Sequence, residues 1–101
     1  ARAFRRAAAD ECWDAAGEGR PITADLKRKL RLAATDAVTR SAQAVDLCYH
    51  AAGGSAIFES HPLQRVFRDV HVATQHGMVA PRTLETLGRV QFGLPTDAGQ
   101  L

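Results

Sequence analysis

The segment from His50 to Gly77, HAAGGSAIFESHPLQRVFRDVHVATQHG, concentrates the side chains of this sequence that could do chemistry. It contains all four histidines of the chain, a Gly-Gly-Ser triplet and an adjacent arginine–aspartate pair. Imidazole exchanges protons near neutral pH, and a glycine-rich turn lets backbone N–H groups approach a ligand closely. This segment is therefore where we expect a functional site.

The spacing of the histidines argues against a metal site. His71 and His76 are five residues apart, about 140° around a helix, so they lie on different faces. A zinc-binding pair on a helix needs an i, i+4 spacing, as in HExxH, and that motif is not in the sequence. Cys48 and His50 do not form a convincing nucleophile and base, because no third group stands out to orient the base.

The triplet Gly53-Gly54-Ser55 has two interpretations. A glycine in the left-handed conformation commonly ends a helix, which explains one of the two glycines. Two glycines and a serine also expose N–H groups and a hydroxyl that suit a phosphate or the edge of a ring. Arg68 and Asp69 are neighbours, so they point to different faces of a helix. The residue types alone leave these alternatives open.

The composition is that of one small soluble domain without a strong charge bias. The chain has 101 residues, of which 46% are hydrophobic and 24% charged, and its net charge is +2. Basic residues gather at 2–6 and 27–31, but acidic residues are interspersed elsewhere, which favours solvated helix faces over nucleic-acid contact. No apolar run approaches the length of a membrane span, and no signal-peptide pattern is present.

The cysteines and the first residue add two expectations. Cys12 and Cys48 are too few and too far apart for a disulfide framework or a zinc site. Both fall on the apolar side of a predicted helix, so we expect buried free thiols in a reducing cytoplasm. The chain begins at Ala1, already within a helical pattern, as a piece of a longer polypeptide would.

Apolar periodicity predicts an all-α fold, an antiparallel helical bundle that forms a single domain over 1–101. The predicted helices cover about 2–16, 23–52, 62–76 and 81–92. Thr23 is the expected N-cap of the second helix and Ser60 that of the third. The apolar stripe of the long second helix is made mostly of small residues, which lets neighbouring helices approach closely. Because a long helix needs neighbours along its whole length, we expect apolar faces that parts outside this chain cover.

The order of these features resembles a known family. A long helix that ends in GGS, a hydrophobic-Phe segment and then PLQRVFRDVHVATQHG are similar to the C-terminal helical domain of the acyl-CoA dehydrogenase superfamily. The resemblance covers about Phe4 to Leu94 and is strongest over Gly53–Gly77. The run QRVFRDVHVATQH is most similar to the flavin-dependent monooxygenase branch, which includes the larger components of two-component aromatic hydroxylases and thiophene-desulfurising monooxygenases.

The same resemblance indicates which branch to disfavour. Related dehydrogenases often continue the Arg-Asp helix into a Tyr-Glu-Gly turn, whose glutamate abstracts the α-proton of the substrate. Arg68 and Asp69 match the Arg-Asp pair, whereas Gly77 takes the position of the glutamate. No carboxylate occurs from Val70 to Arg82. An acyl-CoA dehydrogenase is therefore one alternative, and a non-enzymatic helical regulatory or binding module is another.

The resemblance implies roles for the candidate residues. A histidine at the position of His76 lies beside the flavin, where it would hydrogen-bond the flavin C4a-hydroperoxide or take the phenolic proton of the substrate. Gly53, Gly54 and Ser55 would approach a reduced flavin, FMN or FAD, that a neighbouring subunit and missing domains mostly hold.

Arg68 and Asp69 would orient the helix that presents His76, and His71 is expected to be structural. The implied partners are the N-terminal and middle domains of the same protein, further copies in a homotetramer, a separate flavin reductase and a small aromatic substrate. No nucleic-acid, membrane or metal partner is expected. The chain by itself is expected to be inactive, because it supplies only one side of a site.

Overall fold

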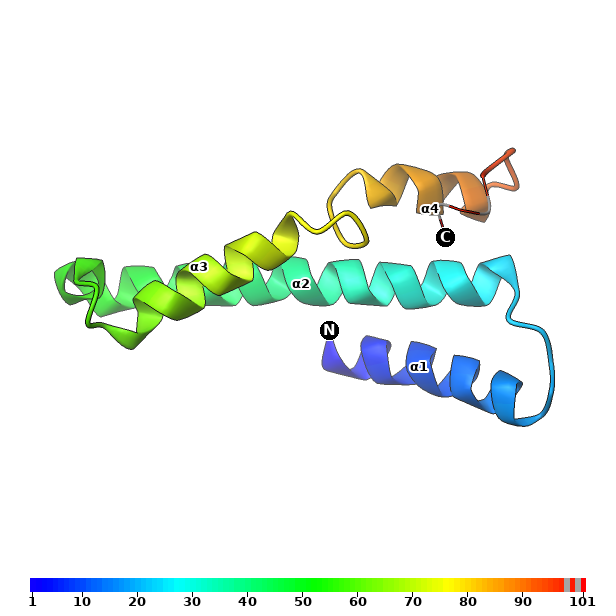
Figure 1. Ribbon diagram of the computed structural model, residues 1–101, viewed down its shortest axis with the longest axis horizontal. Helices are drawn as coiled ribbons and strands as arrows, with labels where there is room; N and C mark the ends of the chain where they lie inside the picture. Colours follow the sequence, from blue (N-terminus) through cyan, green and yellow to red (C-terminus); the bar gives the residue numbers. More distant parts are fainter. Residues whose placement is uncertain (98, 100) are drawn as a thin grey trace.

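A single long helix, α2, runs the length of the molecule, and the other helices pack along it (Figure 1). The computed structural model describes residues 1–97, 99 and 101, and these form helices and no strand. The elements are α1 (Arg2–Gly17), α2 (Ala24–Ala52), the 3-10 helix η1 (Gly53–Ile57), α3 (Pro62–Thr74) and α4 (Thr83–Gln91). The predicted all-α fold is confirmed.

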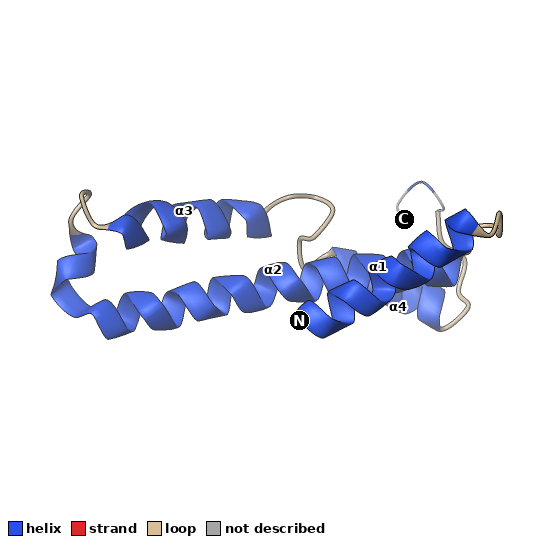
Figure 2. Cartoon of the chain, turned by 90° about the horizontal axis from the view of Figure 1, so that it is seen from below, coloured by secondary structure: helices blue, strands red, loops and turns tan. Residues whose placement is uncertain are grey.

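Within the described residues, the three shorter α-helices run antiparallel to α2 and cover different parts of it (Figures 1 and 2). α1 and α4 pack beside its N-terminal half, and α3 packs beside its C-terminal half. The 29 residues of α2 give a helix about 43 Å long, and the molecule measures 51 × 28 × 17 Å. The antiparallel bundle is therefore elongated, with more neighbours around one half of α2 than around the other.

The start of α2 agrees with the prediction. Thr23 Oγ1 accepts a hydrogen bond from the N–H of Leu26 at 3.2 Å. Asp25 lies in the first turn, where the helix dipole favours a carboxylate. The Arg28 guanidinium, hydrogen-bonded to Asp25, holds the pKa of that carboxyl below its usual value. The predicted N-cap at Thr23 is confirmed.

The start of α3 differs from the prediction. Its N-cap is His61, whose Nδ1 accepts a hydrogen bond from the N–H of Leu63 at 3.1 Å. The prediction of Ser60 as the cap is therefore wrong. An imidazole nitrogen satisfies the free N–H just as a hydroxyl oxygen would, and Pro62 occupies the first helical turn, where its missing N–H costs nothing.

The bounds of the last two helices also differ from the prediction. α3 ends at Thr74 and not at the predicted 76; Gln75 is its C-cap, and the chain then turns. Thr74 Oγ1 donates to the carbonyl oxygen of His71 at 2.6 Å, which satisfies a carbonyl in the last turn. α4 covers Thr83–Gln91 and is shorter than the predicted 81–92. His76 therefore lies in a turn and not in a helix.

The core consists mostly of small side chains. No large side chain among the described residues is completely buried. Thr35 is buried and its Oγ1 donates to the carbonyl oxygen of Arg31 at 2.9 Å, so it adds no unpaired hydroxyl to the core. The close approach of helices over small residues agrees with the predicted stripe. The buried apolar residues are Ala8, Ala15, Ala33, Ala42, Ala56 and Leu87.

Large apolar side chains remain exposed on several elements. Trp13 on α1 is 80% exposed, Leu47 on α2 is 71% exposed, and Phe92 after α4 is 79% exposed. Exposed apolar surface of this kind commonly marks an interaction site, so the predicted uncovered faces are present. No described helix has both the length and the apolar character needed to cross a bilayer.

The prediction of two buried cysteines is wrong for Cys48. Cys12 is half-buried, and its thiol lies 3.9 Å from the carbonyl oxygen of Leu26, whereas Cys48 is exposed. α1 packs along the N-terminal half of α2 and does not extend to the half that carries Cys48, and α3, which packs beside that half, does not cover Cys48 either.

Candidate functional site

His76 lies exposed in the turn that joins α3 to α4. Its Nδ1 accepts a hydrogen bond from the N–H of Met78 at 3.1 Å. Its carbonyl oxygen accepts hydrogen bonds from the N–H groups of Val79 and Ala80, both at 2.9 Å. An imidazole that accepts at Nδ1 carries its proton on Nε2 when it is neutral. The turn therefore presents the Nε2–H of His76 as a hydrogen-bond donor, and no described residue accepts from it.

Two contacts from the start of α4 fix this turn. Thr83 is buried, and its Oγ1 donates to the carbonyl oxygen of Gly77 at 3.2 Å. The Nη2 of Arg82 lies 3.3 Å from the position that a Cβ on residue 77 would occupy. Gly77 directly follows the predicted end of the third helix at 76, and a Cβ there would require the Arg82 guanidinium to shift slightly.

The triplet Gly53-Gly54-Ser55 forms the start of η1, at the far end of α2. Gly53 has φ +67° and ψ −150°, a conformation that is nearly restricted to glycine. It is not the left-handed helical conformation expected at a C-cap, although φ is positive as predicted. Gly54 has no positive φ, and a Cβ there would meet nothing within 4 Å. The fold of this chain therefore requires the first glycine but not the second.

Ser55 uses its hydroxyl proton within the chain, because Oγ donates to the carbonyl oxygen of Ala52 at 3.1 Å. The Ser55 oxygen remains able to accept a hydrogen bond. The open space over Gly53 and Gly54 leaves room for a flat or extended group from outside the chain. The open backbone of the triplet therefore suits the approach of a cofactor, whereas Ser55 has no free hydroxyl proton to donate to it.

The triplet and His76 do not meet within the chain. They lie before and after α3, whose 13 residues span about 20 Å. Arg68 and Asp69 lie between them on α3, and both are exposed. Asp69 pairs with Arg65 at 3.5 Å and not with Arg68. Within this chain, Arg68 and Asp69 form no contact to His76, and their supporting role stays a prediction.

Other residues hold α3 on α2. His71 Nε2 lies 2.8 Å from Asp46 Oδ1 on α2. The Phe67 ring packs against both Tyr49 and His71, with ring centroids 5.0 Å and 4.4 Å apart. This agrees with the interpretation of His71 as structural. The sequence showed no sign of Asp46 as its partner, because the register of α3 against α2 depends on the loop between them.

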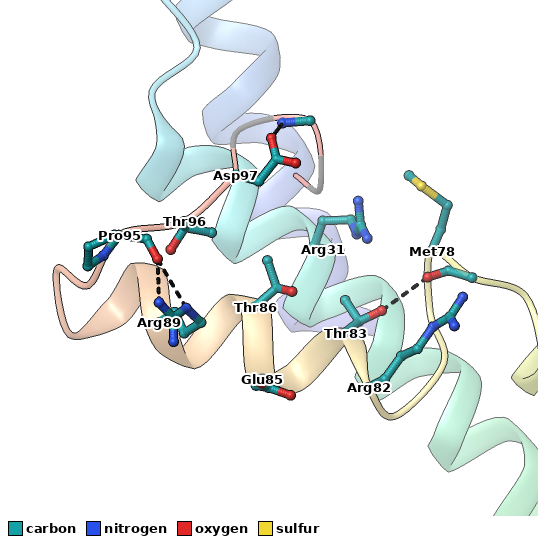
Figure 3. Close-up of a pocket in the computed structure, with 12 residues that line it drawn as sticks. Arg31, Met78, Arg82, Thr83, Glu85, Thr86, Arg89, Pro95, Thr96 and Asp97 are labelled. Atoms are coloured by element: carbon teal, nitrogen blue, oxygen red, sulfur yellow. Dashed lines mark hydrogen bonds between the residues drawn. The ribbon is translucent and has the colours of Figure 1, made fainter.

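A hollow of about 760 Å³ lies beside the His76 turn (Figure 3). It opens between α2, α4, the turn after α3 and the C-terminal segment. Arginines from two helices and from the residue before α4 contribute to its wall. The side chains that line it include Arg31, Met78, Arg82, Glu85, Arg89 and Asp97.

Arg31 and Arg82 are candidate site residues that the sequence did not single out. The basic stretch 27–31 was predicted to be a solvated face. Arg28 pairs with Asp25 but is itself half-buried, and Arg31 is half-buried and faces the hollow, so the prediction of a solvated face is wrong for both. The available signal was the position of Arg31 one turn before Thr35, on a helix face that is partly buried. No group of histidine, cysteine, aspartate and glutamate side chains suited to a metal ion occurs in the part of the chain that the structure describes.

Residues 1–81 match the protein family described as acyl-CoA dehydrogenase, C-terminal domain. Among curated relatives, an indole-3-acetate monooxygenase of Acinetobacter baumannii is 35% identical over 91% of this chain and 24% of its own length. A pigment production hydroxylase of Rhodococcus erythropolis is 32% identical over 74% of this chain and 19% of its own length. The HsaA oxygenase subunit of a flavin-dependent monooxygenase of Mycobacterium tuberculosis is 32% identical over 76% of this chain and 20% of its own length.

Among solved structures, the crystal structure of 3-HSA hydroxylase from Rhodococcus sp. RHA1 is similar with a TM-score of 0.77. The similarity covers 98% of this chain and 29% of that chain, at 24% sequence identity. It supports the helical fold described above. The chain spans about a quarter or less of the length of the curated relatives that it matches.

Proposed function

The chain belongs to the acyl-CoA dehydrogenase family through its C-terminal helical domain, and from this premise we propose that it is that domain of a reduced-flavin-dependent monooxygenase. The parent protein would transfer one oxygen atom from O2 to an aromatic or heteroaromatic substrate. The relatives support this activity, since they are named as monooxygenases or hydroxylases. The parent protein would be cytoplasmic, and this domain alone would be inactive.

The observation that carries the proposal is the chemistry of the turn after α3. From Val70 to Arg82 the chain has no carboxylate that could abstract the α-proton of an acyl thioester. The side chain that the turn presents instead is the imidazole of His76, with its outward Nε2 unpartnered among the described residues. This arrangement disfavours a dehydrogenase and favours a role in oxygen transfer.

The hydrogen bond at Nδ1 favours one of the two roles considered for His76. To take a proton from the substrate at Nε2, the neutral ring would have to carry its proton on Nδ1, opposite the N–H of Met78. Two N–H groups cannot hydrogen-bond each other, so this tautomer loses the contact. We therefore assign His76 as a donor from Nε2 to an oxygen atom on the flavin side, and not as the base.

Bound reduced flavin, FMN or FAD, would supply the activation of O2. The open backbone at Gly53 and Gly54 fits the approach of such a group. Because this triplet and His76 are separated by the length of α3, about 20 Å, one flavin ring cannot lie against both. We propose that His76 faces the flavin of its own subunit and that the triplet, with the Ser55 oxygen as an acceptor, faces a flavin held mostly by a neighbouring subunit of a homotetramer.

The proposal includes further partners. The N-terminal and middle domains of the parent protein would cover the exposed apolar faces of this domain and hold most of the flavin. A separate reductase would supply reduced flavin, as the name "oxygenase subunit" of the HsaA relative suggests for that protein. Arg68 and Asp69, exposed on α3, would contact those missing parts and so orient the helix before His76.

The test is stopped-flow absorbance of the full-length parent protein, mixed as its reduced-flavin complex with oxygenated buffer. We expect a delay before the oxidised-flavin spectrum returns, and little release of H2O2 when substrate is present. His76→Ala should shorten the delay and raise H2O2 release. The exposed neighbour Gln75 gives the matched control, since Gln75→Ala changes the same turn without the imidazole. Immediate reoxidation of the wild-type flavin would contradict the proposal.

A further inference from the structure

The attachment of α3 to the rest of the molecule depends on few contacts. No residue of α3 is buried. Its pair Arg65–Asp69 lies within the helix and does not connect it to another element. Among the described residues, one ion pair joins α3 to another helix, between His71 and Asp46 of α2. The position of α3 against α2 is therefore sensitive to this pair.

The pair is directional but contributes little free energy. A carboxylate only accepts hydrogen bonds, so the Nε2 of His71 carries the proton that Asp46 Oδ1 accepts at 2.8 Å. The two side chains are 40% and 41% exposed, and ion pairs with such access to water stabilise a fold only weakly. The Phe67 ring, with its centroid 4.4 Å from that of His71, packs against the imidazole. Such a pair serves to select one register of α3 on α2 among those that the apolar stripe permits.

Hydrogen bonds connect His71 to the turn that presents His76. The carbonyl oxygen of His71 accepts from Thr74 Oγ1 at 2.6 Å, in the last turn of α3. The N–H of His76 donates to the carbonyl oxygen of Ala73 at 3.2 Å, so the turn departs directly from that last helical turn. A slip of α3 by one residue would move this point about 1.5 Å along the helix axis and about 100° around it. Because a catalytic group must be held to about 0.5 Å, the register of α3 decides where His76 can donate.

We propose that Asp46 is a positioning residue for His76. Through its hydrogen bond with His71, Asp46 fixes the register of α3 and thereby the place from which the Nε2–H of His76 donates to an oxygen atom on the flavin side. This inference rests on the proposed function, because it takes that donor role of His76 as its starting point. Asp46 acts through His71 and needs no contact of its own with flavin or substrate.

The first test follows the turn itself in the full-length parent protein. Hydrogen–deuterium exchange, read by mass spectrometry, reports on the N–H groups of Val79 and Ala80, which both donate to the carbonyl oxygen of His76 at 2.9 Å. Asp46→Ala should speed their exchange about twofold to fivefold, the range of a half-exposed ion pair. Asp46→Asn should restore the wild-type rate, because its amide oxygen still accepts from the Nε2–H of His71.

The second test asks whether Asp46 acts through His76. The readout is the ratio of H2O2 to hydroxylated product in the parent protein. Asp46→Ala should raise this ratio about twofold to fivefold in the otherwise wild-type protein. It should add nothing in the His76→Ala background, because the hydrogen bond that it positions is already lost there. A residue that supported only the fold would raise the ratio in both backgrounds.

Asp36→Ala is the matched control, because Asp36 also lies on α2 but pairs at 2.8 Å with Arg40 of the same helix. It should change neither the exchange nor the ratio. Unchanged exchange in Asp46→Ala, a failure of Asp46→Asn to restore it, or an equal rise of the ratio in the His76→Ala background would each overturn the proposal. The proposed function is judged separately, by the reoxidation delay of the flavin in the wild-type protein. Immediate reoxidation would reject both ideas, whereas a normal delay with any of those three results would reject only this one.

Discussion

At His76, the hydrogen bond from the Met78 N–H to Nδ1, 3.1 Å long, leaves the proton of the neutral ring on Nε2. A backbone contact in the turn thereby restricts the chemistry of the side chain, and it does so before any ligand binds. Gly77 and Thr83 hold the same turn in place through the 3.2 Å hydrogen bond between them. The sequence predicted that a histidine would be presented here, but it could not show which ring nitrogen would be free.

The donor role of His76 predicts a difference between two substitutions in the parent protein. A glutamine amide can donate a hydrogen bond but cannot take a proton near neutral pH, so His76→Gln should keep much of the coupling that His76→Ala loses. The loss of one hydrogen bond to a charged acceptor, about 1.5 kcal/mol, corresponds to about a tenfold rise in H2O2 release in the alanine variant. The measurement is the ratio of H2O2 to hydroxylated product. If glutamine uncouples as fully as alanine, His76 acts as a base.

At the scale of the elements, α3 separates the two parts of the candidate site and is itself held by α2. The pair His71–Asp46 and the ring of Phe67 against Tyr49 fix the position of α3. The apolar stripe of α3 could be predicted from the sequence, because residues a turn apart on a helix share a face. The residues of α2 that contact α3 could not be predicted, because they depend on the path of the chain through η1 and the loop after it.

The junction of α2 and η1 predicts opposite results for its two glycines. Gly53→Ala should destabilise the parent protein by about 1–3 kcal/mol, because φ +67° with ψ −150° is strained for any side chain with a Cβ. Gly54→Ala should leave the melting temperature nearly unchanged, since a Cβ there meets nothing within 4 Å. If an external flavin lies over this turn, Gly54→Ala should still lower flavin occupancy. Thermal denaturation by circular dichroism and the flavin content after gel filtration measure the two effects, and an unchanged flavin content would exclude Gly54 from the cofactor site.

At the scale of the whole molecule, the chain is an elongated bundle with a core of small residues. Its large apolar side chains lie mostly outside that core, as the 80% exposure of Trp13 and the 79% exposure of Phe92 show. Burial of large side chains supplies most of the hydrophobic free energy of folding, so this chain gains little of it from its own contacts. The rest must come from surfaces that cover these faces.

The isolated chain is therefore expected to self-associate or to unfold at low temperature. Sedimentation velocity over a dilution series should show a sedimentation coefficient that decreases as the protein is diluted. Circular dichroism should show a broad thermal transition or one at low temperature. The parent protein, in which other domains cover the same faces, is the control and should melt later and sharply. A compact, dilute monomer of the isolated chain that melts cooperatively would contradict this prediction.

The sequence by itself determined the local properties of this protein. Helix periodicity, the cap at Thr23, a glycine at the end of the long helix and the absence of a carboxylate between Val70 and Arg82 all follow from residues a few positions apart. Hydrogen bonds and steric limits of this kind act within about one turn of helix, so residue type and spacing are enough to predict them.

Only the tertiary structure decided which distant residues meet. It brought Arg31 and Arg82 into one hollow, joined His71 to Asp46, and kept the glycine triplet apart from His76 by the length of α3. It also exposed Cys48 and ended α3 before His76. These outcomes depend on where each loop ends and how one helix is registered against another. Neither the loop ends nor the helix register can be predicted from short-range spacing. Many registers would bury the same apolar stripes, and only the packing of the side chains selects one of them.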